Sequence, residues 1–170
     1  MKKMILFLSV FSLVVFTSCK KEEPEKPKDP VYKVLPDPTG TVSKDFQNTS
    51  EFIHFTTGSL QYYLGWKKPN HLTIGHPEYG CGIYDIGEVK CLANITSIPA
   101  YNNGYGWKGV KDCKFNHGYV GRYLKEFNSA TDMSKNTYEY VRLYVEDRIV
   151  NERGELVGVR VKYQYPFVPK

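Results

Sequence analysis

Aromatic side chains next to amide side chains are the first residues in this sequence whose types suggest chemistry. The segment from Pro99 to Trp107 reads Pro-Ala-Tyr-Asn-Asn-Gly-Tyr-Gly-Trp. A flat aromatic ring can stack on the apolar face of a sugar, while nearby amides bind its hydroxyl groups. Because Trp and Tyr each bury about 150–250 Å² and often fill a core instead, both interpretations stay open. The candidate ligand-binding residues are Trp66, Tyr101, Asn102, Asn103, Tyr105, Trp107 and Tyr119.

Acidic side chains suggest a second chemistry, because a pair of carboxylates can hydrolyse a glycosidic bond. The sequence places no two of them at a defined distance, and solvated strand faces account for them better. The motifs Gly-x-Ser-x-Gly, His-Glu-x-x-His and the P-loop are absent. We therefore expect a non-enzymatic protein without a cofactor, and a glycoside hydrolase-like enzyme is the weaker alternative. The acidic candidates are Asp85, Glu88, Asp112, Glu146 and Asp147.

Cysteine chemistry depends on the compartment. Besides Cys19, the sequence has Cys81, Cys91 and Cys113. An exported protein permits disulfides, but an odd count leaves at least one thiol free. We expect either one bridge, Cys91 with Cys113 or Cys81 with Cys91, or three small buried hydrophobic residues.

Histidines provide the one arrangement that resembles a metal cluster, His71 and His76 followed by Glu78. On strands or loops this spacing fixes no common face, and the sequence contains no Cys-x-x-Cys pair. We expect incidental surface histidines and no metal site.

The first nineteen residues suggest export and attachment to a membrane. Lys2 and Lys3 precede an apolar run from Met4 to Phe16, and Thr-Ser-Cys19 follows. The run has the length of a signal peptide and is shorter than the roughly 20 residues of a membrane span. It resembles the bacterial lipoprotein signal, in which the Cys becomes the acylated first residue of the mature chain, although Phe16 stands where Leu is usual. The resemblance implies lipidation of Cys19 with palmitate-type chains, and two or more such chains anchor a protein firmly.

A charged, proline-rich stretch follows Cys19 and reads Lys-Lys-Glu-Glu-Pro-Glu-Lys-Pro-Lys-Asp-Pro. Such a composition cannot bury enough apolar surface to fold, so it predicts a solvated tether. Its Lys-Glu-Glu cluster resembles the tag that sends Bacteroidota lipoproteins to the outer face of the outer membrane. We expect a signal peptide over 1–18, the lipidated Cys and tether over 19–36, and one domain over 37–170.

The domain has roughly 130 residues, enough for a single core. The formal charge of +5 includes the two lysines of the signal, so the mature chain is only mildly basic. It has no run of basic residues interleaved with aromatics, and we expect no nucleic-acid partner. Aromatic residues make up 15% of the sequence, which favours β-structure.

Alternating apolar residues predict a series of short strands separated by turn residues. The runs 51–57 and 59–66 are either hairpin partners or one strand with a bulge at Gly58. The runs 109–115 and 119–125 are predicted to form a hairpin through Asn116-His-Gly118. The stretch 88–93 is either a strand or a single helical turn, of which we favour the short helix, and the loops are 99–107 and 128–136. The other predicted strands are 41–46, 72–75 and 83–86.

The C-terminal runs 140–146 and 157–165 give the clearest fold signal. Both apolar sets must share a face, so Val145 is predicted opposite Val161. That register also places Glu146 opposite Arg160, an attractive cross-strand pair. Together these elements predict an all-β fold with minor helix, either an antiparallel sandwich or a barrel-like sheet, ending in a long hairpin.

Several motifs resemble a group of uncharacterised small outer-membrane lipoproteins of Bacteroidota. They are Asp85-Ile-Gly-x-Val89, Ile95-Thr-x-Ile-Pro99, Gly106-Trp107, Gly118-Tyr-Val-x-Arg122, Tyr140-x-Arg-x-Tyr-Val-x-Asp147 and Val161-Lys-Tyr-Gln-x-Pro-Phe167. The resemblance implies a β-rich, surface-anchored lipoprotein and brings no catalytic residues. We expect a binding or assembly domain held to the membrane by Cys19, with polysaccharide or outer-membrane proteins as partners. The alternative is a glycan-binding accessory protein of a polysaccharide-uptake system.

Overall fold

The computed structural model describes residues 34–47, 51–57, 60–67, 70–74, 80–100 and 107–169. All of them belong to one compact unit, Tyr32–Lys170. Within these ranges, no helix is long and apolar enough to cross a membrane. Several residues singled out in the sequence lie outside the described ranges: Cys19, His76, Glu78, Tyr101, Asn102, Asn103 and Tyr105.

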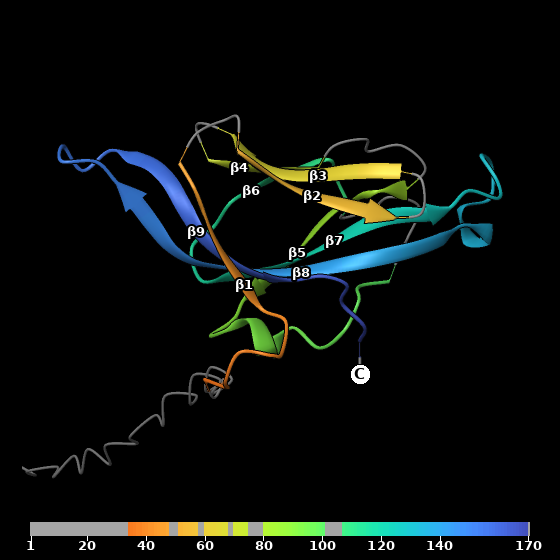
Figure 1. Cartoon of the computed structure of the whole chain (residues 1–170), viewed down its shortest axis with the longest axis horizontal. Coiled ribbons are helices and arrows are strands. Elements are labelled where there is room, and N and C mark those ends of the chain that lie inside the picture. Colours follow the sequence, from red (N-terminus) through yellow and green to blue (C-terminus); the bar gives the residue numbers. More distant parts are fainter. Residues whose placement is uncertain are drawn as a thin grey trace, which may run out of the picture. The chain divides into compact units, whose positions relative to one another are not determined.

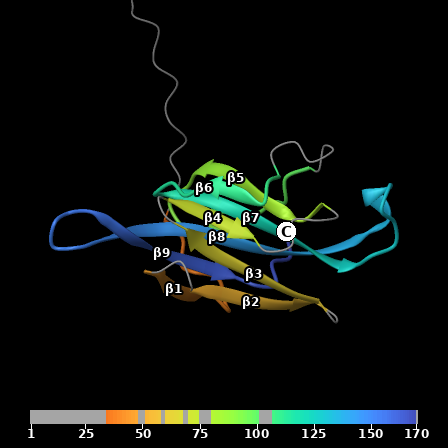
Figure 2. The same ribbon diagram turned by 90° about the horizontal axis from the view of Figure 1, so that it is seen from above.

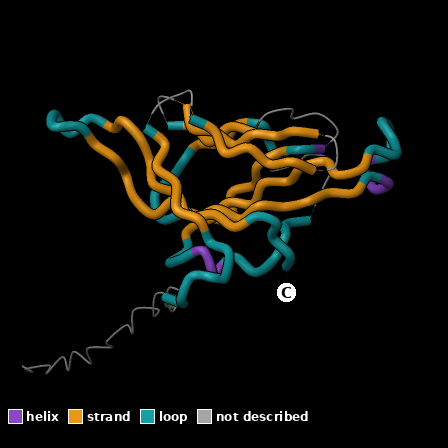
Figure 3. Tube along the Cα trace, viewed as in Figure 1, coloured by secondary structure: helices purple, strands orange, loops and turns teal. Residues whose placement is uncertain are grey.

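Two antiparallel sheets form the domain (Figure 1). One has the strand order β1-β9-β8-β7-β5 and the other β2-β3-β4-β6. They are not closed into a barrel, so the all-β prediction is confirmed in its sandwich-like form (Figure 3). The strands are β1 (Val42–Phe46), β2 (Phe52–Thr57), β3 (Leu60–Lys67), β4 (His71–Ile74), β5 (Gly82–Glu88), β6 (Val110–Asp112), β7 (His117–Glu126), β8 (Thr137–Val150) and β9 (Leu156–Gln164).

Helix is minor in the described part of the chain and consists of two 3-10 turns, η2 (Leu92–Asn94) and η3 (Met133–Lys135). Of the stretch 88–93, Glu88 belongs to β5, and only Leu92 and Ala93 belong to a helical turn, the 3-10 turn η2. The predicted loop 128–136 contains η3.

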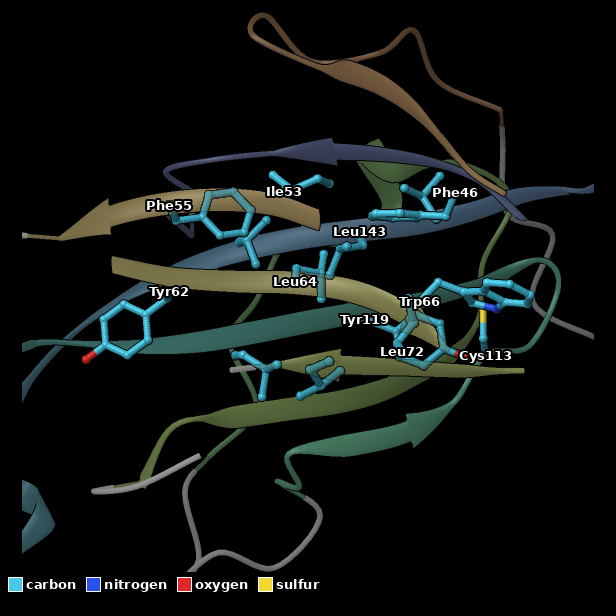
Figure 4. Packing of buried hydrophobic residues seen from close by; sticks show 14 of the residues in the cluster. Phe46, Ile53, Phe55, Tyr62, Leu64, Trp66, Leu72, Cys113, Tyr119 and Leu143 are labelled. Carbon is cyan, nitrogen blue, oxygen red and sulfur yellow. The ribbon is translucent and has the colours of Figure 1, made fainter. Parts of the chain in front are cut away.

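The main core lies between the two sheets. In β3, the alternate residues Tyr62, Leu64 and Trp66 are buried, as the pattern of a half-buried strand requires. They face β7, whose Tyr123 ring lies 5.3 Å from that of Tyr62. Figure 4 shows the three β3 side chains together with Leu143 of β8. This shared core fixes how the two sheets pack.

The opposite face of the five-stranded sheet carries a second apolar cluster. Val120 of β7 and Tyr144 of β8 point to this side. Leu92 of η2, Trp107 and Phe167 cover them. Phe167 is held there because its N–H donates to the carbonyl of Tyr140, at 2.7 Å. The five-stranded sheet is thus covered on both faces, and its second face carries the site described below.

The long C-terminal hairpin is present, and β8 runs past the end of the four-stranded sheet (Figure 2). Val145 lies opposite Val161, as predicted. The predicted pairing of Glu146 with Arg160 is wrong, because a bulge shifts the register and places Asp147 opposite Arg160. A bulge sets two residues against one. The carboxylate oxygen of Glu146 instead lies 2.7 Å from Nζ of Lys162. Lys162 is two residues from Arg160 in β9, so both side chains are on the same face of the strand.

Two predicted hairpins had different outcomes. The runs 51–57 and 59–66 are hairpin partners, with Phe52 opposite Gly65. The hairpin predicted around Asn116-His-Gly118 is wrong, because β6 pairs with β4 whereas β7 pairs with β5 and β8. The left-handed residue of this connection is Asn116, with φ of 59°, and not Gly118. The chain therefore crosses from one sheet to the other here.

Candidate functional site

The aromatic residues predicted to bind sugar are buried where the structure describes them. Trp66 and Tyr119 are fully buried in the main core. Trp66 donates its indole N–H to the side-chain oxygen of Asn70, at 3.1 Å. Trp107 is 5% exposed and packs between the ring of Tyr84, at 5.6 Å, and the guanidinium of Arg122, at 4.9 Å. Of the two interpretations left open by the sequence, burial therefore supports the core interpretation for Trp66 and Trp107, and neither ring is exposed for stacking on a sugar.

The cysteines do not form the expected bridge. Cys81, Cys91 and Cys113 are buried free thiols. Cys81 and Cys113 belong to the core between the sheets, whereas Cys91 lies on the second face beside η2. The alternative of small buried hydrophobic residues fits their positions. Burial raises the pKa of Cys113 to about 12 and also raises that of Cys81.

The acidic candidates are dispersed among separate ion pairs. Asp85 lies 2.9 Å from His117 and 3.5 Å from Lys114. Asp112 lies 3.1 Å from His71. Among the described residues, no three His, Cys, Asp or Glu side chains gather in a way that could hold a metal ion. These contacts are separate from one another and do not bring two carboxylates together in a shared cleft.

A cavity of about 450 Å³ lies on the second face of the five-stranded sheet. Among the described residues of its wall, Asp37, Thr39 and Thr96 have polar side chains, and Arg142 of β8 is the cationic one. We refer to this cavity as the Arg142 pocket. Its apolar lining comes from Leu35, Pro36, Pro38, Ala93, Phe167 and Val168.

Arg142 is held firmly in the wall of this pocket. It is 9% exposed, its Nε donates to the side-chain oxygen of Gln164 at 2.8 Å, and its Nη1 donates to the carbonyl of Ile95 at 2.6 Å. Its guanidinium also lies over the ring of Phe167, 4.7 Å from the centroid. Burial lowers the pKa of Arg142, because the apolar surroundings disfavour the charged form. Even so, an arginine stays protonated in proteins.

The rim of the pocket is built by the segment that leads into the domain, Leu35 to Thr39. Lys162 of β9 lies 3.0 Å from Asp37, and Gln164 donates to the carbonyl of Thr39 at 2.7 Å. At the other end of the segment, the N–H of Leu35 approaches the sulfur of Cys91 at 3.4 Å. These contacts with β9 and the η2 region hold the segment in place as one wall.

A second cavity, of about 410 Å³, lies beside η3 and includes Arg122. Here the guanidinium has a structural partner, because Nε donates to the carbonyl of Gly80 at 2.7 Å. It also packs over the rings of Tyr138, at 4.3 Å, and Trp107. Arg122 therefore joins the β5 entry to β7, and we take the Arg142 pocket as the stronger binding site.

Three aromatic rings occupy the outer face of the four-stranded sheet. Phe52 packs edge-on against Tyr63, at 4.9 Å, and against His54, at 6.4 Å. Tyr63 is 36% exposed, and His54 is exposed as well. The ring of Phe52 lies over Gly65, since a Cβ there would come within 2.5 Å of it. This group supplies the exposed aromatic surface that the sequence assigned to other residues.

Sequence reasoning did not single out Arg142 or Phe167 as site residues, although both lie within the matched motifs. Arg142 alternates with apolar neighbours in β8 and therefore reads as a solvent-facing residue. Arg142 differs from a solvent-facing residue because the chain after β9 folds back and places Phe167 over its guanidinium. A single sequence does not show that return.

Fold and site together define a class, a two-sheet antiparallel β-protein with a small, largely apolar pocket around a buried arginine. No family model, no curated protein and no solved structure matches the chain.

Proposed function

We propose that this chain is a surface-anchored lipoprotein whose domain binds a small ligand and catalyses no reaction. The anchor is the lipid on Cys19, at the outer face of the outer membrane. Support for this localisation comes from the signal-like start, the small residues before Cys19 and the charged stretch after it.

The observation that supports a binding role is the Arg142 pocket. Ligand sites are concave, mostly apolar and equipped with a few polar groups that fix orientation, with volumes of about 300–1,000 Å³. The pocket is about 450 Å³, and its described wall has six apolar residues and one buried cation. Its walls come from β8, the η2 region, the segment after β9 and the segment Leu35 to Thr39. A wall made from four separate segments suits a preformed binding site.

The lipid anchor and the surface localisation are tested on cells that produce the full chain. Growth with an alkyne analogue of palmitate should label the wild-type protein and leave Cys19→Ser unlabelled. Proteinase added to intact cells should digest the wild-type domain. A labelled Cys19→Ser protein would refute the anchor, and a domain protected in intact cells but digested after lysis would refute the outward orientation.

The binding role is tested with the full chain in lipid nanodiscs. A library of small metabolites is screened for compounds that raise the unfolding temperature, because a ligand that binds only the folded state stabilises it. Thr96→Trp is the blocking variant, since Thr96 is an exposed residue at the pocket wall. We expect hits that stabilise the wild type and not Thr96→Trp. Hits that stabilise both equally would place binding elsewhere.

The half-buried ring of Phe52 and the exposed rings of His54 and Tyr63 favour a second candidate, a glycan-binding accessory protein. Aromatic side chains on an outer sheet face can contact a polysaccharide too long for the Arg142 pocket. Affinity electrophoresis against a polysaccharide panel would test it, with Tyr63→Ala compared with the wild type. Retardation lost in Tyr63→Ala would support this role, and the absence of retardation on every polysaccharide would refute it for those sugars.

A further inference from the structure

The charge of Arg142 has no anionic partner among the described residues. Its two hydrogen bonds go to neutral acceptors, the side-chain amide of Gln164 and the carbonyl of Ile95. Asp37 is the one acidic residue among the described residues of the pocket wall, and its carboxylate is bound by Lys162 at 3.0 Å. Charged groups that are this strongly buried are normally paired. A buried, uncompensated cation beside a cavity indicates that an anion completes the site.

The remaining donors of Arg142 suit a particular anion. Nε and Nη1 are engaged, whereas Nη2 donates to no atom of the residues that the structure describes. One face of the guanidinium is covered by Phe167. The free edge therefore presents planar N–H donors, which match the oxygens of a carboxylate. Only one buried cation is present in the described wall, whereas a dianion such as phosphate would gain from several.

The remaining wall residues indicate what the uncharged part of the ligand is like. Apolar wall residues such as Pro36, Pro38 and Phe167 surround the position, and the hydroxyls of Thr39 and Thr96 are the neutral polar groups. This lining suits an organic group of modest size, and the second charge at the described wall, the carboxylate of Asp37, is already paired with Lys162. The segment that carries both prolines is itself pinned to β9.

We infer that the Arg142 pocket binds the carboxylate of a small organic acid, with Nη2 of Arg142 donating to it and the apolar wall contacting its body. This inference rests on the binding function proposed above and names the chemical class of its ligand. A free carboxylate can come from an apolar amino-acid derivative or from a sugar acid, and the test separates these two sources.

The experiment measures binding of matched probes to the full chain in lipid nanodiscs by isothermal titration calorimetry. One pair is N-acetyl-leucine with N-acetyl-leucinamide, and the other is glucuronate with glucose. Each pair keeps the body of the molecule nearly constant and differs in the carboxylate. The proteins are wild type, Arg142→Gln, Arg142→Lys, Thr96→Trp and Arg153→Gln, in which an exposed turn arginine is changed as the charge control.

We expect one acid to bind at least tenfold more tightly than its neutral partner, in line with a charge-assisted hydrogen bond. Arg142→Gln and Thr96→Trp should abolish that preference, Arg142→Lys should retain part of it, and Arg153→Gln should leave it unchanged. The acid that binds identifies the source of the carboxylate. Because Arg142→Gln also removes two structural hydrogen bonds, its unfolding temperature is measured, and Thr96→Trp tests the pocket without touching the arginine.

Two results would overturn the inference. If acid and neutral partner bind equally and Thr96→Trp removes both, the pocket binds ligands but does not select a carboxylate, and the binding function survives alone. If neither acid binds and the metabolite screen also gives no ligand sensitive to Thr96→Trp, the carboxylate inference and the binding function fail together.

Discussion

Asp85 of β5 and His117 of β7 lie across neighbouring strands, with Oδ1 of the aspartate 2.9 Å from Nδ1 of the histidine. The same oxygen accepts the N–H of Gly87, also at 2.9 Å, and Lys114 lies 3.5 Å from the other oxygen. Burial alone would raise the pKa of Asp85, but the hydrogen bonds from His117 and Gly87 and the nearby positive charges outweigh it. The pKa of Asp85 therefore lies below its ordinary value of 3.8.

This lowered pKa predicts a pH-dependent stability. A carboxyl group whose pKa is depressed in the folded state stabilises the fold above its unfolded pKa, and that contribution is lost as the pH falls through the folded value. We expect Asp85→Asn to lower the free energy of unfolding by about 1–2 kcal/mol at pH 7. The difference from wild type should shrink steadily below about pH 4.

Urea unfolding at a series of pH values from neutral to strongly acidic measures this effect. Glu152→Gln, at the exposed β8–β9 turn, is the matched control and should follow the wild type at every pH. A loss in Asp85→Asn that is equally large at acidic and neutral pH would show that the carboxylate charge is not responsible.

Trp66 is predicted to act through packing. Replacing a fully buried large aromatic with alanine removes many contacts and leaves a cavity. We expect Trp66→Ala to lower the free energy of unfolding by about 3–5 kcal/mol. Trp66→Phe, which loses the hydrogen bond to Asn70, should lose less, about 1–2 kcal/mol.

Guanidinium chloride unfolding measures the Trp66 variants, with Tyr63→Ala as the comparison from the exposed face of the same strand. That variant should lose no more than about 1 kcal/mol. A stable Trp66→Ala protein would contradict the placement of this ring in the core between the sheets.

Local alternation predicts the faces of these strands well and their irregularities poorly. The shared apolar face of Val145 and Val161 follows from the pleat alone, because successive side chains alternate between faces. The bulge at Glu146 does not follow from it, since one extra residue in a strand leaves both flanking patterns intact. The predicted register therefore held on one side of the bulge and was wrong by one residue on the other.

Which sheet a strand joins is a long-range property. The turn residues between β6 and β7 resemble a hairpin link, and Asn116 does adopt the left-handed conformation. The chain nevertheless crosses between sheets there, where Tyr119 accepts the N–H of Lys114 and donates to the carbonyl of Asp112. The local sequence does not show whether a buried tyrosine stabilises a connection between two sheets or lies in a hairpin.

The site was the least predictable part for a related reason. Trp66, Trp107 and an exposed binding aromatic have the same residue types and similar neighbours in the chain. Burial decides between core and site, and burial depends on segments distant in sequence, as with Phe167 over Arg142. The interpretation of Trp66 and Tyr119 as core residues was among the alternatives, whereas the Arg142 pocket was not.

Gly158 of β9 is predicted to be irreplaceable because β1 ends against it. A Cβ at this position would overlap the carbonyl oxygen of Phe46 and lie 3.0 Å from the Cα of Gln47. These are backbone atoms, so relief requires the end of β1 to move away from β9. We expect Gly158→Ala to lower the free energy of unfolding by about 2–3 kcal/mol.

Hydrogen exchange distinguishes a local displacement of β1 from a general loss of stability. The amides of β1 should lose protection in Gly158→Ala, while those of β3 keep theirs at matched stability. Gly40→Ala is the control, because its Cβ would meet no atom within 4 Å and only its φ of 81° is strained. It should lose about 1 kcal/mol without selective exposure of β1. Unchanged β1 protection in Gly158→Ala would contradict the close approach.

Cys113 is predicted to be unreactive in the folded protein and fully reactive after unfolding. It is 2% exposed, and burial raises the pKa of its thiol to about 12. Because the thiolate is the nucleophile, the raised pKa leaves very little of this thiol reactive at pH 8. We expect iodoacetamide to label Cys113 at least 100-fold more slowly in the native protein than in urea without reductant. Mass spectrometry of the peptide that contains Cys113 measures this rate apart from the other thiols. Fast native labelling would contradict its burial, and a Cys113 that stays unlabelled in urea until reductant is added would reinstate the disulfide.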